Sequence, residues 1–239
     1  MAVVVVIPAY NESRTIGAVA EECKKFADEV IVANDGSLDE TAIIARQAGA
    51  RVVTHMVNRG YGAALKTGMM AALERGADIV VTIDADGQHE PSEIPRLIDP
   101  IVSRRGVLQY APTIGGGGYP DIVIGDRFAH DSQREGMSFM RKCMIGFGNA
   151  LTWMLYGVWL SDTQSGFRAY TRHALERLHV GAEGMEFSSE VIGEAARQGL
   201  RIALVPISVR YTAYSLAKGQ NIFTGASTAL RLFLRRITR

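Results

Sequence analysis

The chain has 239 residues, of which 47% are hydrophobic and 21% charged, and its formal net charge is +1. This composition is that of an ordinary globular domain, and the near-zero net charge provides no global field that would attract nucleic acid. No apolar run approaches the roughly 18 to 20 residues that span a bilayer, so we expect no transmembrane segment. Cys23 and Cys143 lie far apart without a metal-ligand spacing, and a reducing cytoplasmic compartment suits them.

Strand-like and helix-like segments alternate four times within the first ninety residues. The predicted strands are β-branched runs at 2–7, 29–33, 51–54 and 79–83. The predicted helices run from 13 to about 27 with Ser13 as the cap, then to about 48, from 63 to 75 and from 91 to 103. This alternation predicts an α/β fold with a mostly parallel central sheet and helices on both faces.

The second half of the chain is less regular. Residues 104–120 interrupt the alternation, and four consecutive glycines at 115–118 indicate a surface excursion. We then expect strands at 121–125, 166–170 and 201–205, helices at 137–156, 171–178 and 186–198, and a polar loop at 161–165. An amphipathic helix is predicted at 222–237. Residues 1–220 therefore form the expected globular domain, and 221–239 form an appended helix.

Two carboxylates follow the predicted strand at 79–83, and they organise the rest of the chain. Asp84 and Asp86 are separated by one residue and stand at the mouth of a sheet, where α/β folds bind ligands. They repel each other unless a cation lies between them, and hard oxygen ligands at this spacing suit Mg²⁺ or Mn²⁺ that also holds a diphosphate. The alternative is a polar turn in which Asp86 or Ser92 caps the next helix.

Other loops should meet these carboxylates. In a doubly wound sheet, the segments 8–12, 34–39, 84–89 and 126–127 converge on one crevice. That much charge is costly to leave unpaired, so a cation and an anionic ligand are implied together. Asp35 can accept a hydrogen bond from a base, and Tyr10 offers a ring for stacking. The charged residues expected in the crevice are Glu12, Asp35, Asp84, Asp86 and Arg127.

The motifs, taken together, carry a family resemblance. They are VIPAYNE at 6–12, NDGSLDET at 34–41, DADGQH at 84–89, DTQSGFR at 162–168 and VPIS at 205–208. In this order and at these spacings the chain resembles the family 2 glycosyltransferases of GT-A fold over about residues 3–220. Within that family it is similar to the dolichyl- or polyprenyl-phosphate sugar transferases.

The resemblance implies a role for each matching residue. Arg127 matches a residue that contacts the donor or acceptor phosphate, and Lys218 matches a basic residue of the acceptor loop. The family usually has two aspartates where this chain has Asn34 and Asp35, so only Asp35 is carried over. The family's loop arginine falls opposite Thr212, and Arg210, two residues away, is the candidate replacement. The implied donor-binding residues are Pro8, Tyr10, Glu12, Asp35, Asp84, Ala85 and Asp86, and the implied metal ligands are Asp84, Asp86 and Gln88.

The function that this resemblance implies is inverting transfer of a hexose, mannose or glucose, from a nucleoside diphosphate sugar to a polyprenyl or dolichyl phosphate. A phosphate acceptor is already ionised at neutral pH and requires no strong general base. One alternative is a soluble transferase acting on the hydroxyl of a glycan or small molecule, with Asp162 as the base. Another is a non-catalytic nucleotide-sugar-binding subunit, which the intact Asp84 and Asp86 argue against.

The helix at 222–237 suggests a location at the membrane. Its apolar residues alternate with arginines, and sixteen residues at about 1.5 Å each are too short to span a bilayer. We therefore expect it to lie on the cytoplasmic face of a membrane as a peripheral contact. The alternatives are that it packs on its own domain or under a partner subunit.

Three further polar residues have ordinary alternatives. His89 is as consistent with a solvated turn as with a metal ligand. Glu190 is interpreted as a surface carboxylate, and Lys66 as an exposed helix lysine. The segment 60–65 lacks the third glycine of a dinucleotide-binding loop and does not follow the first strand, which excludes a Rossmann dehydrogenase.

Overall fold

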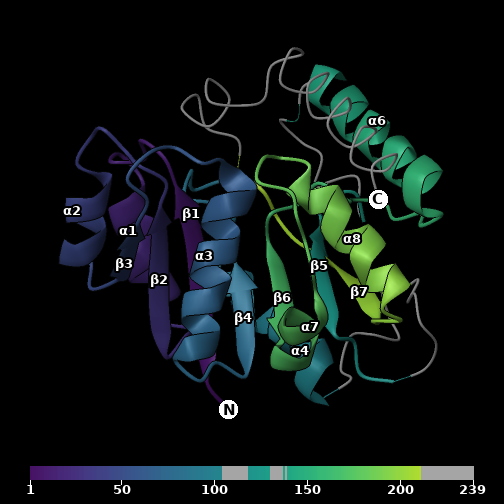
Figure 1. Cartoon of the computed structure of the whole chain (residues 1–239), viewed down its shortest axis with the longest axis horizontal. Coiled ribbons are helices and arrows are strands. Elements are labelled where there is room, and N and C mark those ends of the chain that lie inside the picture. Colours follow the sequence, from purple (N-terminus) through teal and green to yellow (C-terminus); the bar gives the residue numbers. More distant parts are fainter. Residues whose placement is uncertain (104–117, 130–136, 138, 211–239) are drawn as a thin grey trace.

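The computed structural model describes residues 1–103, 118–129, 137 and 139–210, without the side chains of 139–141. Its centre is one seven-stranded sheet in the order β3-β2-β1-β4-β6-β5-β7 (Figure 1). The strands are β1 (Val3–Ala9), β2 (Glu29–Asn34), β3 (Arg51–Thr54), β4 (Ile79–Thr82), β5 (Ile122–Asp126), β6 (Arg168–Thr171) and β7 (Ile202–Pro206). The α/β class and the strand positions predicted from the sequence are confirmed.

Six of these strands run in one direction, and β6 runs against them. β1 pairs in parallel with β2 and β4, and β5 pairs in parallel with β7. β6 is antiparallel to both β4 and β5. The carboxyl ends of β1, β2, β4 and β5 therefore meet at one edge of the sheet. Because β6 is reversed, the loop that precedes it is delivered to the same edge.

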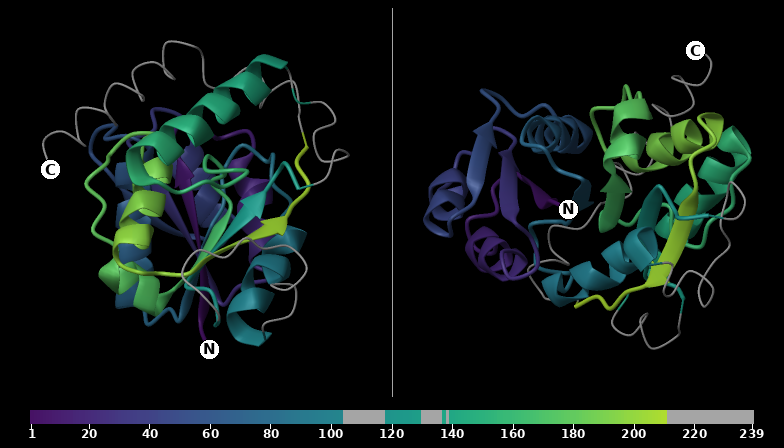
Figure 2. Two further views of the ribbon diagram at one scale, coloured as in Figure 1. Left: turned by 90° about the vertical axis from the view of Figure 1, so that its right-hand side faces the viewer. Right: turned by 90° about the horizontal axis from the view of Figure 1, so that it is seen from below.

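Helices cover both faces of the sheet (Figures 1 and 2). Val5 and Ile7 of β1 face a core that includes residues of α1, α2 and α4, whereas Val4 and Val6 face a second core with residues of α3, α7 and α8. This alternation is what a strand buried on both faces requires. The helices are α1 (Ile16–Cys23), α2 (Thr41–Gln47), α3 (Tyr61–Glu74), α4 (Ile94–Ser103) after a 3₁₀ turn (Pro91–Glu93), α6 (Phe139–Tyr156), α7 (Arg172–Arg177) and α8 (Phe187–Arg197).

The first helix starts later than the sequence indicated. Its N-cap is Thr15, without a side-chain cap, and not Ser13. Ser13 instead donates its backbone N–H to Asp39 Oδ2 at 3.1 Å. The residues before α1 are therefore used to join two loops at the edge of the sheet. The predicted helix at 222–237 and most of the 104–120 segment lie outside the described residues.

Candidate active site

The loops after β1 and β2 are joined to each other by hydrogen bonds. Asn11, whose φ is 55°, donates its backbone N–H to Ser37 Oγ at 3.0 Å and accepts from Leu38 N at 2.9 Å through its side chain. Glu12 donates its N–H to Thr41 Oγ1 at 2.7 Å. The two predicted nucleotide-binding loops are thus one unit, and the serine and threonine of the NDGSLDET motif build that unit.

Three residues of the first loop were predicted to line the donor pocket. Pro8 is buried in β1 opposite Ala33 of β2. Tyr10 is 42% exposed, so its ring is open for stacking. Glu12 is half-buried, and its negative charge lies close enough to Asp86 to raise the pKa of the Asp86 carboxylate. The structure therefore brings Tyr10 and Glu12 to the edge that carries residues 84–89, which we call the metal loop after the ion predicted to bind there.

Asp35 is buried and holds the chain that leads into α3. Its Oδ1 accepts from the Arg59 N–H at 2.9 Å and lies 2.7 Å from His55 Nδ1, and its Oδ2 accepts from the Gly60 N–H at 2.8 Å. His55 Nε2 in turn lies 2.8 Å from Thr67 Oγ1. A carboxylate has about four acceptor positions, so one position remains for the predicted contact with a base.

The pair of aspartates follows β4 directly, as predicted. The pKa of Asp86 is raised to about 6, mainly by burial and next by the negative charge of Asp84. Hydrogen bonds from Gln88 lower this pKa, but by less. Ala85 between them is buried. A carboxylate that binds its proton more tightly than usual because of nearby negative charge is stabilised by a cation at the same place.

Gln88 is directed at Asp86. Its backbone N–H donates to Asp86 Oδ1 at 3.0 Å, and its side-chain Nε2 donates to Asp86 Oδ2. These bonds close a tight turn and orient the carboxylate. The structure therefore shows Gln88 as an orienting neighbour of Asp86, and its part as a metal ligand stays a prediction.

Asp84 is held by residues from three separate elements. Tyr61, the first residue of α3, donates its hydroxyl to Asp84 Oδ1 at 3.0 Å. His89 Nε2 lies 3.7 Å from Asp84 Oδ2. Gly166 is pressed against the same carboxylate, because a Cβ there would lie 2.6 Å from either oxygen and 2.5 Å from the Tyr61 hydroxyl. Thr82 fixes Gly166 by donating to its carbonyl at 2.7 Å.

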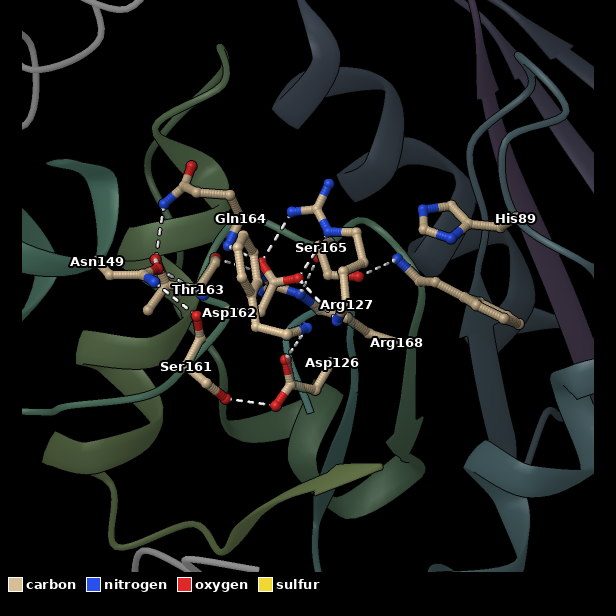
Figure 3. A network of polar contacts seen from close by, with 12 residues as sticks. His89, Asp126, Arg127, Asn149, Ser161, Asp162, Thr163, Gln164, Ser165 and Arg168 are labelled. Atoms are coloured by element: carbon tan, nitrogen blue, oxygen red, sulfur yellow. Dashed lines mark hydrogen bonds and ion pairs between the residues drawn. The ribbon is translucent and has the colours of Figure 1, made fainter. Parts of the chain in front are cut away.

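The loop at 161–165 was predicted as a polar loop, but most of its residues are buried, and it lies beside the metal loop. Asp162 is fully buried and receives three bonds from Arg127, at 2.6 Å from Nε, 2.8 Å from Nη2 and 3.2 Å from the backbone N–H. Asn149 of α6 donates to the Ser161 carbonyl at 2.6 Å and accepts from Thr163 N at 2.9 Å. Figure 3 shows Asn149 and Arg127 reaching this loop from opposite sides.

Arg168 closes this network from β6. Arg168 is buried, and its guanidinium donates to three backbone carbonyls, those of Thr163 at 2.8 Å, Ser165 at 2.8 Å and Ser188 at 3.2 Å. A buried arginine is tolerated because these bonds satisfy its donors. It ties the loop to the start of α8 and so fixes Gly166 beside Asp84.

Arg210 lies next to the metal loop. Its backbone N–H donates to the Gln88 carbonyl at 2.8 Å, and Val209 pairs with His89 as an isolated antiparallel bridge. The Arg210 side chain is largely exposed and forms an ion pair with Glu90. The structure thus places Arg210 beside the metal loop, its role toward a phosphate stays a prediction, and Lys218 and Thr212 lie outside the described residues.

A model described as glycosyl transferase family 2 matches residues 4–178. The chain belongs to this family. It is 32% identical to a UDP-N-acetylglucosamine–dolichyl-phosphate N-acetylglucosaminyltransferase of Methanococcus voltae over 96% of this chain and 94% of that one. It is 30% identical to a polyprenol monophosphomannose synthase of Mycolicibacterium smegmatis over 91% of this chain and 82% of that one.

Solved structures agree with this assignment. A crystal structure of glucosyl-3-phosphoglycerate synthase from Mycobacterium tuberculosis, with Mn²⁺, uridine diphosphate and glucosyl-3-phosphoglycerate, matches with a TM-score of 0.72 at 27% identity. The match covers 98% of this chain and 79% of that one. The GT-A fold expected for this family 2 glycosyltransferase is therefore confirmed.

The residues of the metal loop suit a divalent ion that also binds diphosphate oxygens. Asp84 and Asp86 supply hard oxygen ligands, and the raised pKa of Asp86 reflects the negative charge that an ion would offset. In the part of the chain that the structure describes, no group of three or more histidine, cysteine or acidic side chains is arranged to hold a metal by itself. An ion with few protein ligands and a phosphate-bearing substrate is the usual arrangement for Mg²⁺.

Two expectations about single residues need correction. Glu190 is buried rather than exposed, and it accepts from the Gly181 and Ala182 N–H groups at 3.1 and 2.8 Å. His89 is also buried and packs against Phe167 with 5.3 Å between ring centroids, so it is no solvated turn residue. Each is buried by tertiary contacts from another element, which local sequence does not reveal.

Lys66 and Asp162 also differ from their expected surroundings. Lys66 is half-buried and donates to the Gly181 carbonyl at 3.3 Å. Asp162, the suggested general base, is fully buried in its ion pair with Arg127. A paired and buried carboxylate is poorly placed to take a proton from a hydroxyl acceptor. Direct phosphate contact by Arg127 stays a prediction, since its bonds to Asp162 are what the structure shows.

Sequence reasoning missed Tyr61, and the structure predicts a positioning role for it. A Tyr61→Phe variant keeps the ring but loses the bond to Asp84 Oδ1, so the carboxylate gains freedom to rotate. Loss of such an orienting bond typically lowers metal affinity by about 10- to 100-fold. Calorimetric titration with Mn²⁺ in the presence of UDP measures this without turnover. Tyr119→Phe is the control, because Tyr119, near the start of β5, is 45% exposed and the same hydroxyl group is removed. Unchanged affinity in Tyr61→Phe would exclude the role.

Proposed function

We propose that this chain transfers a hexose or N-acetylhexosamine from a nucleoside diphosphate sugar to a polyprenyl or dolichyl phosphate, with inversion at the anomeric carbon. Support comes from the relatives named for dolichyl and polyprenol phosphate sugar transfer. The structural observation that carries the proposal is the ion pair that buries Asp162 against Arg127. Because this carboxylate is committed to Arg127, an acceptor that arrives already ionised suits the site better than a neutral hydroxyl.

The joined loops after β1 and β2 would bind the nucleotide. Tyr10 offers its exposed ring to the base. Asp35 and Glu12 belong to the same joined loops and supply carboxylates beside it. Asp84 and Asp86 would hold Mg²⁺ or Mn²⁺, which supplies charge stabilisation to the departing diphosphate. Tyr61, His89 and Gly166 keep Asp84 in one orientation, so little reorganisation is required when the donor binds.

Basic residues would receive the acceptor phosphate. Arg210 is attached to the metal loop through its backbone bond to Gln88, and its exposed side chain can exchange Glu90 for a phosphate. Lys218 is proposed to act beside it, as the family resemblance implies. Positive charge on these residues would allow the anionic acceptor to bind next to the anionic donor. Holding the two substrates in reacting positions then supplies much of the rate acceleration.

A phosphorylated small molecule is the second candidate acceptor. The matching crystal structure of glucosyl-3-phosphoglycerate synthase contains such a product together with UDP and Mn²⁺. This acceptor would use the same basic residues but would not need a membrane. A hydroxyl of the acceptor would then be the nucleophile and would need a general base. Asp162, the base suggested from the sequence, is held in its ion pair with Arg127.

One experiment separates these acceptors. The protein with Mg²⁺ or Mn²⁺ is incubated with radiolabelled GDP-mannose, UDP-glucose or UDP-N-acetylglucosamine, and with a short-chain polyprenyl phosphate, the matching polyprenol, or 3-phosphoglycerate. We expect label in the polyprenyl phosphate product alone, released by mild acid. Label in 3-phosphoglycerate supports the second candidate, and label in polyprenol contradicts the need for an ionised acceptor.

A further inference from the structure

Helix α6 has its polar side facing inward. Asn149 is buried with both side-chain atoms bonded to the loop at 161–163, and Thr152 is fully buried with its hydroxyl donating to Ser189 at 2.9 Å. Gly148 packs directly against Gln164, where a Cβ would lie 3.1 Å from the side chain. The face that joins α6 to the domain therefore combines these hydrogen bonds with the packing of Ile145 and Tyr156.

The opposite side of α6 is apolar and exposed. Phe147 is 59% exposed, Trp153 55% and Met154 64%, and Trp159, just after the helix, is 61% exposed. The rings of Trp153 and Trp159 meet edge to face with centroids 6.4 Å apart. The sequence from 143 to 160 contains no charged residue. We call Phe147, Ala150, Trp153, Met154 and Trp159 the outer face of α6.

This arrangement is the reverse of the usual one. A surface helix of a water-soluble domain presents its polar side to water and its apolar side to the core. Large contiguous apolar patches on such a surface mark contacts with another protein or a membrane. The outer face of α6 therefore has the character of a contact surface for another apolar phase.

We propose that the outer face of α6 rests in the interfacial region of a lipid bilayer. Tryptophan is the side chain most characteristic of that region, because its large ring is apolar and its N–H reaches polar groups. Figures 1 and 2 show α6 lying across the end of the molecule toward which β4 points, which is the edge that carries the metal loop. The choice of lipid over another apolar partner rests on the proposed function, since its acceptor is held in a bilayer.

The helix would lie along the membrane surface and not cross it. In the described residues, no helix is both long and apolar enough to span a bilayer. The bonds from Asn149 and Thr152 hold α6 to the buried loop and to α8. An amphipathic helix in this position buries its apolar side by several ångströms among the headgroups. The crevice beside it would then face a lipid-bound phosphate.

The two tryptophans of the outer face are the only ones in the chain, so tryptophan fluorescence, excited selectively over that of tyrosine, reports on this surface alone. We expect their emission to shift to shorter wavelengths when vesicles of phosphatidylcholine and phosphatidylglycerol are added to the full chain. Brominated lipids should quench that emission. Before lipid is added, acrylamide should quench both indoles readily, because the outer face is open to water.

Met154→Glu tests the surface without touching either fluorophore. Adding a charge there should lower vesicle partitioning about tenfold or more, since the apolar contact is lost and anionic headgroups repel the new carboxylate. Met70→Glu on α3 is the matched control, because Met70 is 61% exposed and the charge change is the same. It should bind vesicles as the parent chain does, and both variants should melt normally.

Activity on two acceptors separates this proposal from the proposed function. Met154→Glu should lose transfer to a polyprenyl phosphate embedded in vesicles but keep transfer to a short-chain, water-soluble polyprenyl phosphate. If neither acceptor is used by the parent chain, the proposed function fails, and vesicle binding still tests the surface.

Three results would overturn the membrane assignment. Vesicles that leave the emission unchanged exclude a lipid contact. Indoles protected from acrylamide at every protein concentration indicate that another segment of this chain covers α6. Protection that appears only at high concentration indicates a second copy of the chain.

Discussion

Asp84→Asn and Asp86→Asn should each lower turnover about a thousandfold or more, which corresponds to about 4 kcal/mol of lost transition-state stabilisation. Each change removes one hard oxygen ligand and one negative charge from the metal loop. The same changes should leave thermal stability unchanged or raise it. Burial and the Asp84 charge already raise the pKa of Asp86 to about 6, so the metal-free protein gains from losing a charge there. Opposite effects on activity and stability distinguish a metal ligand from a structural carboxylate.

Initial rates in EDTA, and again after adding Mg²⁺ or Mn²⁺, complete the test. Asp78→Asn is the matched control, because Asp78 precedes β4 at the opposite edge of the sheet and its side chain is 52% exposed. It should keep full activity. Full activity of the parent chain in EDTA, or of a variant with both loop aspartates changed, would show that the reaction does not depend on a metal at this loop.

Sequence periodicity was sufficient to predict the layers of this fold. The β-branched runs of β1, β2 and β4 were enough to predict that the polar segments after these strands lie at one edge of the sheet. Strand direction was not predicted for β6, because the residues of a short strand are compatible with either direction. That direction is set by pairing between β4 and β5. It matters for the site, since it brings Gly166 to Asp84.

Burial of polar residues could not be predicted from local sequence. The segment around Asp162 and Thr163 has the composition of a surface loop, yet both residues are fully buried. Arg127, just after β5, and Asn149 of α6 satisfy them from distant parts of the chain, together with Arg168 of β6. The same applies to Glu190, and to the orientation of α6, whose residues predicted a helix but not which side faces the domain.

Arg127→Ala and Asp162→Ala should each lower the free energy of unfolding by about 3 to 5 kcal/mol, because either change leaves an uncompensated charge in a buried site. Arg127 is 7% and Asp162 0% exposed at the side chain, and the pair is bidentate. Replacing both residues together, Arg127→Met with Asp162→Asn, should recover much of the loss, since no buried charge is left unpaired and the amide oxygen still accepts from the Arg127 or Gln164 backbone N–H. Urea unfolding of the two single variants and the double variant measures this coupling.

The exposed pair of Arg59 and Glu183 provides the comparison. Its atoms are 3.1 Å apart, but the side chains are 51% and 50% exposed, so water screens the interaction and Arg59→Ala should change stability little. Transfer rates of the same variants then show whether Arg127 also contributes to catalysis, in addition to stabilising the fold. If the double variant folds and retains transfer, the ion pair only positions the loop beside Gly166. If Arg127→Ala unfolds like the parent chain while transfer to a phosphate acceptor is lost, Arg127 contacts the phosphate directly, and the positioning role argued from its bonds to Asp162 is wrong.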